Sequence, residues 1–285
     1  MEELIIENIH ETHNYKLLKE VYFDILVPTF PDPEDHMTWE KMKKMAKKSF
    51  EHPEENEHVL VSVSKQTMPD GTEKPISFFV AIYYKKSRTG LISYMGIRND
   101  VKGVSASNIQ KQVLIEMEKE ASKHNQKLRV ILSLVDLPEH ANPKYITLPP
   151  TQRIMIMEKN GASYIPIDFY YPIFRNTFLS FFKPHVKYKK DAALLGYKLY
   201  GKLPTESPEA LKDFLDDFYR SYGIDLRKNA VLKQMKHEID FIPHGINIKL
   251  SKRYRLKEKE QKVKEKFINC SNVSSSKIVH SPFVC

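Results

Sequence analysis

Residues 89–134 constrain the fold more than any other stretch, because they read as a strand, a long helix and a second strand in succession. Residues 90–97 are apolar with small residues between them, which predicts a buried strand. Apolar residues then recur at helical spacing over 106–123. Residues 128–135 are almost unbroken apolar sequence, which is typical of a parallel strand covered on both faces. We therefore predict a right-handed β–α–β unit.

The loop at residues 99–105 joins the first of these strands to the helix and carries one glycine, Gly103. A helix start presents unpaired backbone N–H groups and the positive end of the helix dipole, which suits a phosphate or pyrophosphate. The alternative is an ordinary connection with a turn glycine. Spacing alone favours that alternative, because a single glycine is a weak signal.

The residues before this unit predict a short strand at 4–6, two helices and a hairpin. Helices are expected at 15–25 and 37–50, with Pro28, Pro31 and Pro33 breaking the chain between them. Strands are expected at 58–65 and 75–84, joined by the turn Pro69-Asp70-Gly71. With the strand at 90–97, these form an antiparallel meander.

After the unit come a proline-rich loop, a short helix and further extended segments. We expect the helix at 151–159, ended by Asn160-Gly161, and a pairing between 162–174 and 192–200. Two more helices are predicted at 208–222, with Ser207 as N-cap, and at about 226–239. The serine-rich end at 271–285 is expected to be loosely ordered.

Charge is concentrated near the C-terminus. The net charge is +9, and residues 249–266 hold nine Lys or Arg against three Glu, or +6. Such a segment can contact nucleic acid or an anionic membrane. We favour a solvated helix with internal Glu–Lys pairs, because Tyr254 is the only aromatic residue within it.

Cysteine use and hydropathy point to a cytoplasmic protein. The two cysteines, Cys270 and Cys285, form no disulfide framework, and no apolar run approaches the length of a membrane span. The acidic start, with Glu2 and Glu3, is not that of a signal peptide. The hydrophobic content of 41% is that of a folded chain.

The order of predicted elements resembles the GNAT acetyltransferase superfamily over roughly residues 1–200. Local resemblance lies in the loop through Gly103, in Met157-Glu158-Lys159-Asn160-Gly161-Ala162 and in Asp168-Phe169-Tyr170-Tyr171-Pro172. The resemblance implies an α+β fold with a mixed, mostly antiparallel sheet around a central parallel β–α–β unit. It also implies a GNAT-like domain at 1–203, a helical basic extension at 204–268 and a flexible tail at 269–285.

The resemblance implies that the strands at 90–97 and 128–135 part from each other and that acetyl-CoA binds in the gap between them. Backbone amides near Gly96 and Ile97 would polarise the thioester carbonyl, as an oxyanion donor does. Residues of the helix corner would hold the pyrophosphate, namely Lys102, Gly103, Val104, Ser105 and Ala106. Ser105 can also cap the helix. The family has a basic or amide residue where this sequence has Asp100, whose carboxylate repels pyrophosphate and whose effect Lys102 can offset.

The implied activity is transfer of an acetyl group from acetyl-CoA to an amine by direct attack in a ternary complex. Asp136, which follows the second parallel strand, is the expected general base; the alternative is a solvated loop residue. The family's proton-donating tyrosine is replaced by Met157. Tyr164, Tyr170 or Tyr171 of the next strand, or water, can supply the proton instead, and of these we assign Tyr171 to the role; the alternative for each tyrosine is packing. The histidines show no spacing that predicts a metal site.

A second function class stays open, a catalytically weak or inactive GNAT-like module that binds CoA or a protein partner. Met157 and Asp100 favour it, whereas Gly103 and the position of Asp136 favour the enzyme. The acceptor amine, a small molecule or a protein, is not identified by the sequence. Apolar stripes on the helices of 204–268 are compatible with packing on the sheet or on a second copy in a homodimer.

Overall fold

The fold is seen in a computed structural model that describes residues 5–33, 36–68, 70–98, 100–101, 104–140, 143–145, 147–174 and 186–254. Predicted residues Lys102 and Gly103 lie outside this part. The chain divides into two compact units, Met1–Ile248 and Lys249–Cys285. None of the described helices combines the length and the apolar character needed to cross a membrane.

A seven-stranded mixed sheet forms the centre of the first unit, in the order β1-β2-β3-β4-β5-β9-β6. Only β4 and β5 run parallel to each other; every other neighbouring pair is antiparallel. The strands are β1 Ile5–Asn8, β2 Glu57–Thr67, β3 Glu73–Tyr84, β4 Thr89–Ile97, β5 Val130–Asp136, β6 Ala162–Tyr164 and β9 Ala192–Tyr197. The predicted fold class, a mostly antiparallel sheet with a parallel β–α–β unit, is confirmed.

The aromatic segment after β6 is divided between two sheets. Its first residues form β6 and pair with β9, as expected, whereas β7 (Tyr171–Phe174) pairs with β8 (Val186–Lys189) in a separate two-stranded sheet. The backbone between β6 and β7 therefore leaves the main sheet.

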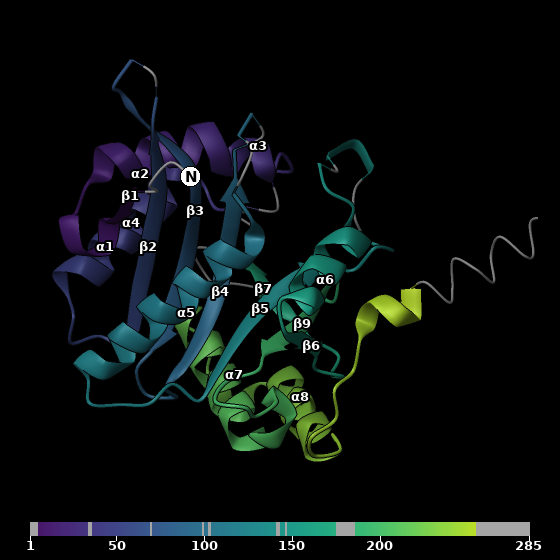
Figure 1. The fold of residues 1–285 in the computed structure, drawn as a ribbon. Helices are drawn as coiled ribbons and strands as arrows, with labels where there is room; N and C mark the ends of the chain where they lie inside the picture. The colour runs from purple at the N-terminus through teal and green to yellow at the C-terminus, as the bar shows by residue number, and fades with distance from the viewer. Residues whose placement is uncertain are drawn as a thin grey trace, which may run out of the picture. The chain divides into compact units, whose positions relative to one another are not determined.

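Helices α1 (Ile9–Thr12), α2 (Tyr15–Val21) and α4 (Trp39–Glu51) surround one end of the sheet (Figure 1). Alternate residues of β3 share a face, and Phe78 and Val80 pack there against α2 and α4. The opposite face of β3 carries α5 (Ala106–Lys123), which Figure 1 shows lying across the strands. The core thus has a helix layer on each side of the sheet.

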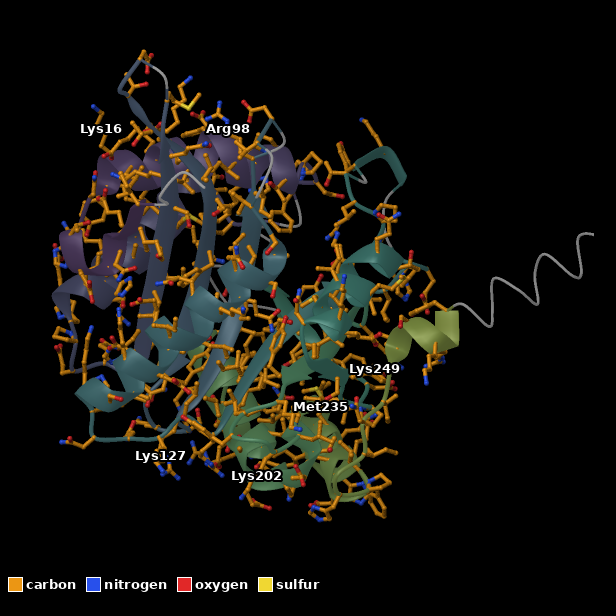
Figure 2. The ribbon with its side chains drawn as sticks, viewed as in Figure 1. Lys16, Arg98, Lys127, Lys202, Met235 and Lys249 are labelled. Carbon is orange, nitrogen blue, oxygen red and sulfur yellow. The ribbon has the colours of Figure 1, made fainter. Side chains whose placement is uncertain are left out.

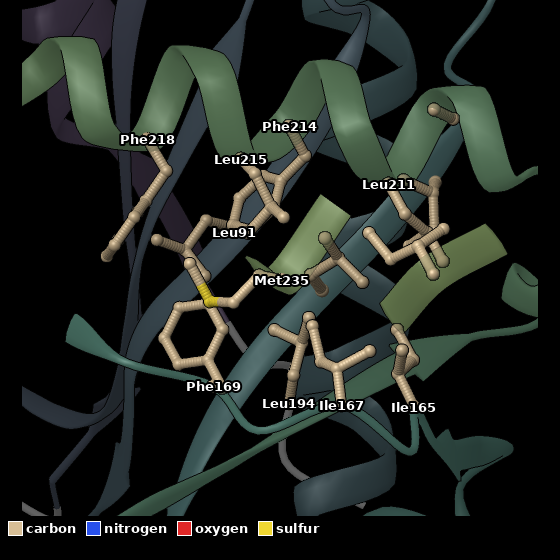
Figure 3. Packing of buried hydrophobic residues seen from close by; sticks show 14 of the residues in the cluster. Leu91, Ile165, Ile167, Phe169, Leu194, Leu211, Phe214, Leu215, Phe218 and Met235 are labelled. Carbon is tan, nitrogen blue, oxygen red and sulfur yellow. The ribbon is translucent and has the colours of Figure 1, made fainter. Parts of the chain in front are cut away.

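Two C-terminal helices continue the first of these layers. Helices α7 (Pro208–Ser221) and α8 (Ala230–Asp240) share a hydrophobic cluster with β3, β4, β5 and β9. Figure 3 shows Phe214, Leu215 and Phe218 of α7 directed at Leu91, with Met235 of α8 beside Phe169. These helices are therefore part of the core of the sheet, while the predicted domain boundary at residue 203 stays a prediction.

The helical run that starts with α2 continues past Pro28, whereas the sequence predicted a helix at 15–25 that the prolines end. It passes through a π-helical turn, Tyr22–Leu26, into the short helix α3, Val27–Thr29. In this turn the N–H of Val27 donates to the carbonyl of Tyr22, five residues earlier. A π-helical turn pairs each N–H with the carbonyl five residues earlier instead of four. Pro28, which has no N–H, follows directly in the first turn of α3, where no N–H is needed.

Candidate functional site

The two parallel strands part along their length. Strands β4 and β5 pair at four positions, from Thr89 with Val130 to Ile92 with Ser133. Beyond Ile92, β4 continues to Ile97 and β5 continues to Asp136 without further β4–β5 pairs. Figure 1 shows the two strands diverging toward these ends. The separation that the resemblance implies is therefore present.

A β-bulge in β4 lies at the point of divergence. On the side of β3, Val80 pairs with Tyr94 but the next residue, Ala81, pairs with Ile92, which leaves Ser93 as an extra residue. A bulge bends its strand and increases the local twist. Because β5 stays paired with β9 as far as Asp136, the bend carries β4 away from β5.

The register determines which amides of the parted segment face the gap. The N–H of Arg98 donates to the carbonyl of Ile76 at 2.8 Å, so this amide points toward β3. In an antiparallel strand the amides alternate, and that of Gly96 therefore also faces β3. The amide of Ile97 faces the other way, toward β5. Of the two predicted carbonyl-polarising amides, Ile97 is the one that the register directs into the gap.

A small cavity of about 210 Å³ adjoins the end of β4. The π-helical turn and α3 form one wall, and Arg98 lies beside α3 in Figure 2. The lining residues are Asp24, Ile25, Pro28, Thr29, Ile97, Arg98 and Asp100. The irregular helix thus supplies a concave surface next to the amide of Ile97.

The start of α5 fits an anion site in its described part. Ser105 caps the helix, and its Oγ accepts the N–H of Asn108 at 3.3 Å, as predicted from the sequence. Val104 and Ala106 flank this cap. An 18-residue helix begins here, so the positive end of its dipole is directed at the loop.

Arg98 neutralises the unfavourable carboxylate of that loop. Its Nε donates to Oδ1 of Asp100 at 2.8 Å. The repulsion that Asp100 exerts on a pyrophosphate is thereby reduced, in a way the sequence analysis did not identify. The two residues are only two positions apart and Arg98 directly follows β4, which is a signal that could have predicted the pair.

Asp136 ends β5 and is bound to Arg153 of α6 (Pro150–Lys159). The Nη1 of Arg153 donates to Oδ2 of Asp136 at 2.9 Å, and its Nε donates to the carbonyl of Leu148 at 3.0 Å. Burial raises the pKa of Asp136 above 3.8, and the guanidinium offsets only part of that increase. A raised pKa suits a proton acceptor, because the group then holds its proton more strongly.

Arg153 also connects the two diverging strands. Its guanidinium lies 6.0 Å from the centre of the Phe30 ring, which meets the Tyr94 ring of β4 edge-on at 5.6 Å. The arginine therefore reaches from the end of β5 to Phe30, which in turn packs against β4. An arginine in the first turn of a helix opposes the helix dipole, and this is the sequence signal that it has a specific acidic partner.

The other predicted catalytic residue, Tyr171, lies in β7. It pairs with Lys189 in the two-stranded sheet and packs against the cluster of α7 and α8. The structure therefore places Tyr171 and Asp136 in different sheets, and the role of Tyr171 stays a prediction. Met157 is half-buried on α6 and has no proton to donate.

Comparison with known proteins gives distant structural similarities. No family model matches the sequence, and no curated protein matches it. The aminoglycoside 6'-acetyltransferase type Ii is similar with a TM-score of 0.39 and 16% identity, covering 68% of this chain and 96% of that one. Tetrahymena GCN5 is similar with a TM-score of 0.39 and 15% identity, covering 70% and 98%.

A third structure, an aminoglycoside 6'-N-acetyltransferase complexed with coenzyme A, has a TM-score of 0.37 and 10% identity, covering 67% and 95%. All three are acetyltransferases, and each covers about two thirds of this chain. Similarities at this distance carry no functional argument, so the functional proposal rests on the geometry of the parted strands.

Proposed function

We propose that this chain is an acyl-CoA-dependent N-acyltransferase that moves an acetyl group from acetyl-CoA to an amine. The observation that carries the proposal is the parting of β4 and β5 after Ile92, with the amide of Ile97 turned into the gap. A gap between parallel strands accepts an extended, amide-containing arm such as pantetheine, which can pair with the exposed strand edges.

The described residues fit the remaining parts of such a substrate. The N-terminus of α5, with Val104, Ser105 and Ala106, suits the pyrophosphate, and Lys102 and Gly103 belong to the same proposed corner. Arg98 reduces the repulsion from Asp100. The substrate supplies an activated acetyl thioester, and the chain supplies its positioning.

Chemistry in the ternary complex requires one bond made and one broken. The amine nitrogen attacks the carbonyl carbon, the C–S bond breaks, and the sulfur leaves as a thiolate. The N–H of Ile97 stabilises the developing oxyanion, an effect worth roughly 3 kcal/mol in acyl transfer. Asp136 accepts the proton lost by the amine, and Tyr171 or water returns a proton to the thiolate.

A second candidate is a module that binds CoA without turnover. The ion pair between Asp136 and Arg153 favours it, since this carboxylate already has a cationic partner at 2.9 Å. Met157 favours it as well, because a thioether cannot act as the acid. The two candidates share the CoA site and differ only in the chemical step.

The binding test measures thermal stability against acetyl-CoA concentration. We expect saturable stabilisation of the wild type. The Gly103→Glu variant should lose it, because the new carboxylate enters the anion corner. Absence of any shift at high acetyl-CoA concentration would contradict both candidates that bind CoA.

The turnover test removes the proposed oxyanion donor. Ile97→Pro deletes the N–H that faces the gap, and the register indicates that this N–H makes no bond to β3. Thiol release with a panel of amines should fall by about 10²–10³-fold, while stabilisation by CoA persists. Ile97→Val is the matched control and should retain turnover. Stabilisation of the wild type without thiol release from any amine would favour the binding module.

The pH profile tests Asp136. Because burial raises its pKa, the rate should increase as pH rises through a value above the ordinary 3.8. Removing the guanidinium in Arg153→Gln should move this rise in rate to higher pH, since the neighbouring positive charge lowers the pKa of Asp136. If the rise in rate with pH is unchanged in both Arg153→Gln and Asp136→Asn, the general base is another group.

A further inference from the structure

His58, Glu120 and His124 meet at the end of α5 opposite to the proposed anion corner. Glu120 and His124 are four residues apart and share a helix face, whereas His58 comes from the start of β2. The helix is 18 residues long, which separates its two ends by about 27 Å. This cluster is therefore remote from the acyl-transfer geometry.

The three donor atoms are close and shielded from solvent. Nδ1 of His58 lies 2.8 Å from Oε1 of Glu120, and Nε2 of His124 lies 3.4 Å from the same oxygen. All three atoms lie within 4.8 Å of one another. The exposed fractions of the side chains are 7% for His58, 8% for Glu120 and 16% for His124. Two histidines and one carboxylate at such a spacing form a ligand set that zinc accepts.

His58 is oriented as a metal-binding histidine would be. Its Nε2 lies 3.1 Å from the carbonyl of Glu55 and donates to it, because a carbonyl can only accept. In the neutral ring, Nδ1 then carries a lone pair that faces the carboxylate of Glu120. A proton or a metal ion is needed between these two atoms. A histidine that binds a metal through one ring nitrogen commonly donates the N–H of the other nitrogen to a backbone carbonyl, as His58 does here.

His124 supplies an independent observation. Its Nε2 is buried and has no hydrogen-bond partner among the described residues, although Glu120 is near. A buried unpaired ring nitrogen is costly and calls for a partner. The Tyr83 ring stacks on the imidazole at 6.2 Å and the His58 ring meets it at 4.7 Å, so aromatic groups hold its orientation.

The nearby cations set the charge of the cluster. Lys123 binds Oε2 of Glu120 at 2.9 Å and leaves Oε1 to the histidines. The charge of a second lysine, Lys85, acts on His124. Lys123 is half-exposed, so its ammonium can move into water when a second cation arrives.

We propose that His58, Glu120 and His124 form a zinc-type metal site that ties the start of β2 to the last turn of α5. Nδ1 of His58, Oε1 of Glu120 and Nε2 of His124 are the protein ligands, and water completes a tetrahedron. A tetrahedral zinc ion needs its ligands about 3.3 Å apart. Nδ1 of His58 and Oε1 of Glu120 therefore have to separate by about 0.5 Å, and the two histidine nitrogens, which lie within 4.8 Å of each other, have to close by up to about 1.5 Å. The site joins two elements far from the acyl-transfer geometry, so bound metal is expected to stabilise the fold, while the water leaves one coordination position open.

The test uses the full chain, stripped with a chelator and then titrated with Zn²⁺ or Co²⁺. We expect stabilisation by one equivalent of Zn²⁺ in thermal unfolding. Bound Co²⁺ should give the visible absorption bands of a tetrahedral site, and Zn²⁺ should displace them. No stabilisation and no bands in the wild type would overturn the proposal.

Variants distinguish this site from others on the chain. His124→Ala and Glu120→Gln should abolish the bands and weaken metal binding by at least about 100-fold. His10→Ala removes the imidazole of a neighbouring pair, in which His10 of α1 faces Glu116 of α5, and should leave the bands unchanged. The double change Cys270→Ser and Cys285→Ser should also leave them unchanged.

Two results would overturn the assignment even if metal binds. Bands that survive in His124→Ala would place the ion elsewhere, and bands lost in the double cysteine variant would indicate thiolate ligation. His124→Gln, which keeps a polar side chain of similar length, replaces His124→Ala if that variant does not fold. All of these readouts are independent of acyl transfer, so failure here leaves the proposed enzyme untouched.

Discussion

Replacing Gly96 by alanine places a methyl group against one of the most buried rings of the sheet. A Cβ at this position would lie 2.6 Å from Cε1 of Phe78 and 3.2 Å from Oγ1 of Thr29. Two carbon atoms normally approach to about 3.5 Å, so the Phe78 ring would have to move by about 0.9 Å. That ring is 1% exposed and packs within the cluster of α2 and α4, which leaves it little room.

Two terms decide the size of the effect. Overpacking of a close-packed core costs about 1–3 kcal/mol. Replacing a glycine by alanine also reduces the conformational freedom of the unfolded chain, which raises the free energy of unfolding by about 0.4–1 kcal/mol. The free energy of unfolding should therefore fall by about 1–2 kcal/mol.

Gly90, on the same strand, is the matched control. There a Cβ would lie 2.9 Å from Sδ and Cε of Met117, the far end of a flexible side chain. Met117 can change its rotamer, so Gly90→Ala should alter the free energy of unfolding by less than about 1 kcal/mol. Denaturant unfolding of both variants measures the difference in the free energy of unfolding. The Tm should fall by about 2–4 °C for each kcal/mol lost. Equal losses at both positions, or a larger one at Gly90, would refute the reasoning.

Three further outcomes can be checked by denaturant unfolding. Gly196→Ala should cost about 1–3 kcal/mol, because the new Cβ would lie 2.5 Å from Cγ of Pro204, whose ring cannot rotate away. Burial raises the pKa of Glu7, but its bonds, first that to Lys65, outweigh this and hold the pKa below 4.5. Glu7→Gln should thus cost about 1 kcal/mol at pH 7, and its difference from the wild type should vanish as pH falls through the folded-state pKa. Ser105→Ala should cost about 1 kcal/mol, since it removes the N-cap of α5; a loss within error would contradict the capping role.

Local sequence patterns predicted much of the fold. The apolar run of β5, the helical spacing of α5 and the cap at Ser105 each depend on neighbours within a few residues, so the sequence alone reveals them. The end of α6 was likewise predicted from its neighbours, because Asn160-Gly161 follows the helix and Gly161 adopts a positive φ there. The π-helical turn before Pro28 was missed, because helical spacing alone does not reveal a turn in which one residue is added.

The candidate site was predicted less completely, for a physical reason. Apart from Tyr171 in β7, its predicted residues that the structure describes lie at strand and helix ends that the β–α–β pattern locates. The ion pair of Asp136 with Arg153 depends on how α6 crosses the end of β5, which no local pattern encodes. The same holds for His58 and Glu120, which are distant in sequence and meet only after α5 packs on the sheet.

The bulge at Ser93 has a consequence for how the protein behaves when its gap is empty. Beyond the bulge, β4 and β5 each present an edge inside the molecule whose amide and carbonyl groups have lost their neighbour strand. Such edges attract any extended chain, so a peptide could insert as readily as a pantetheine arm. Purification with CoA present should therefore suppress self-association, and the strand edge that supports acyl transfer is also the place where this chain is most exposed to misassembly.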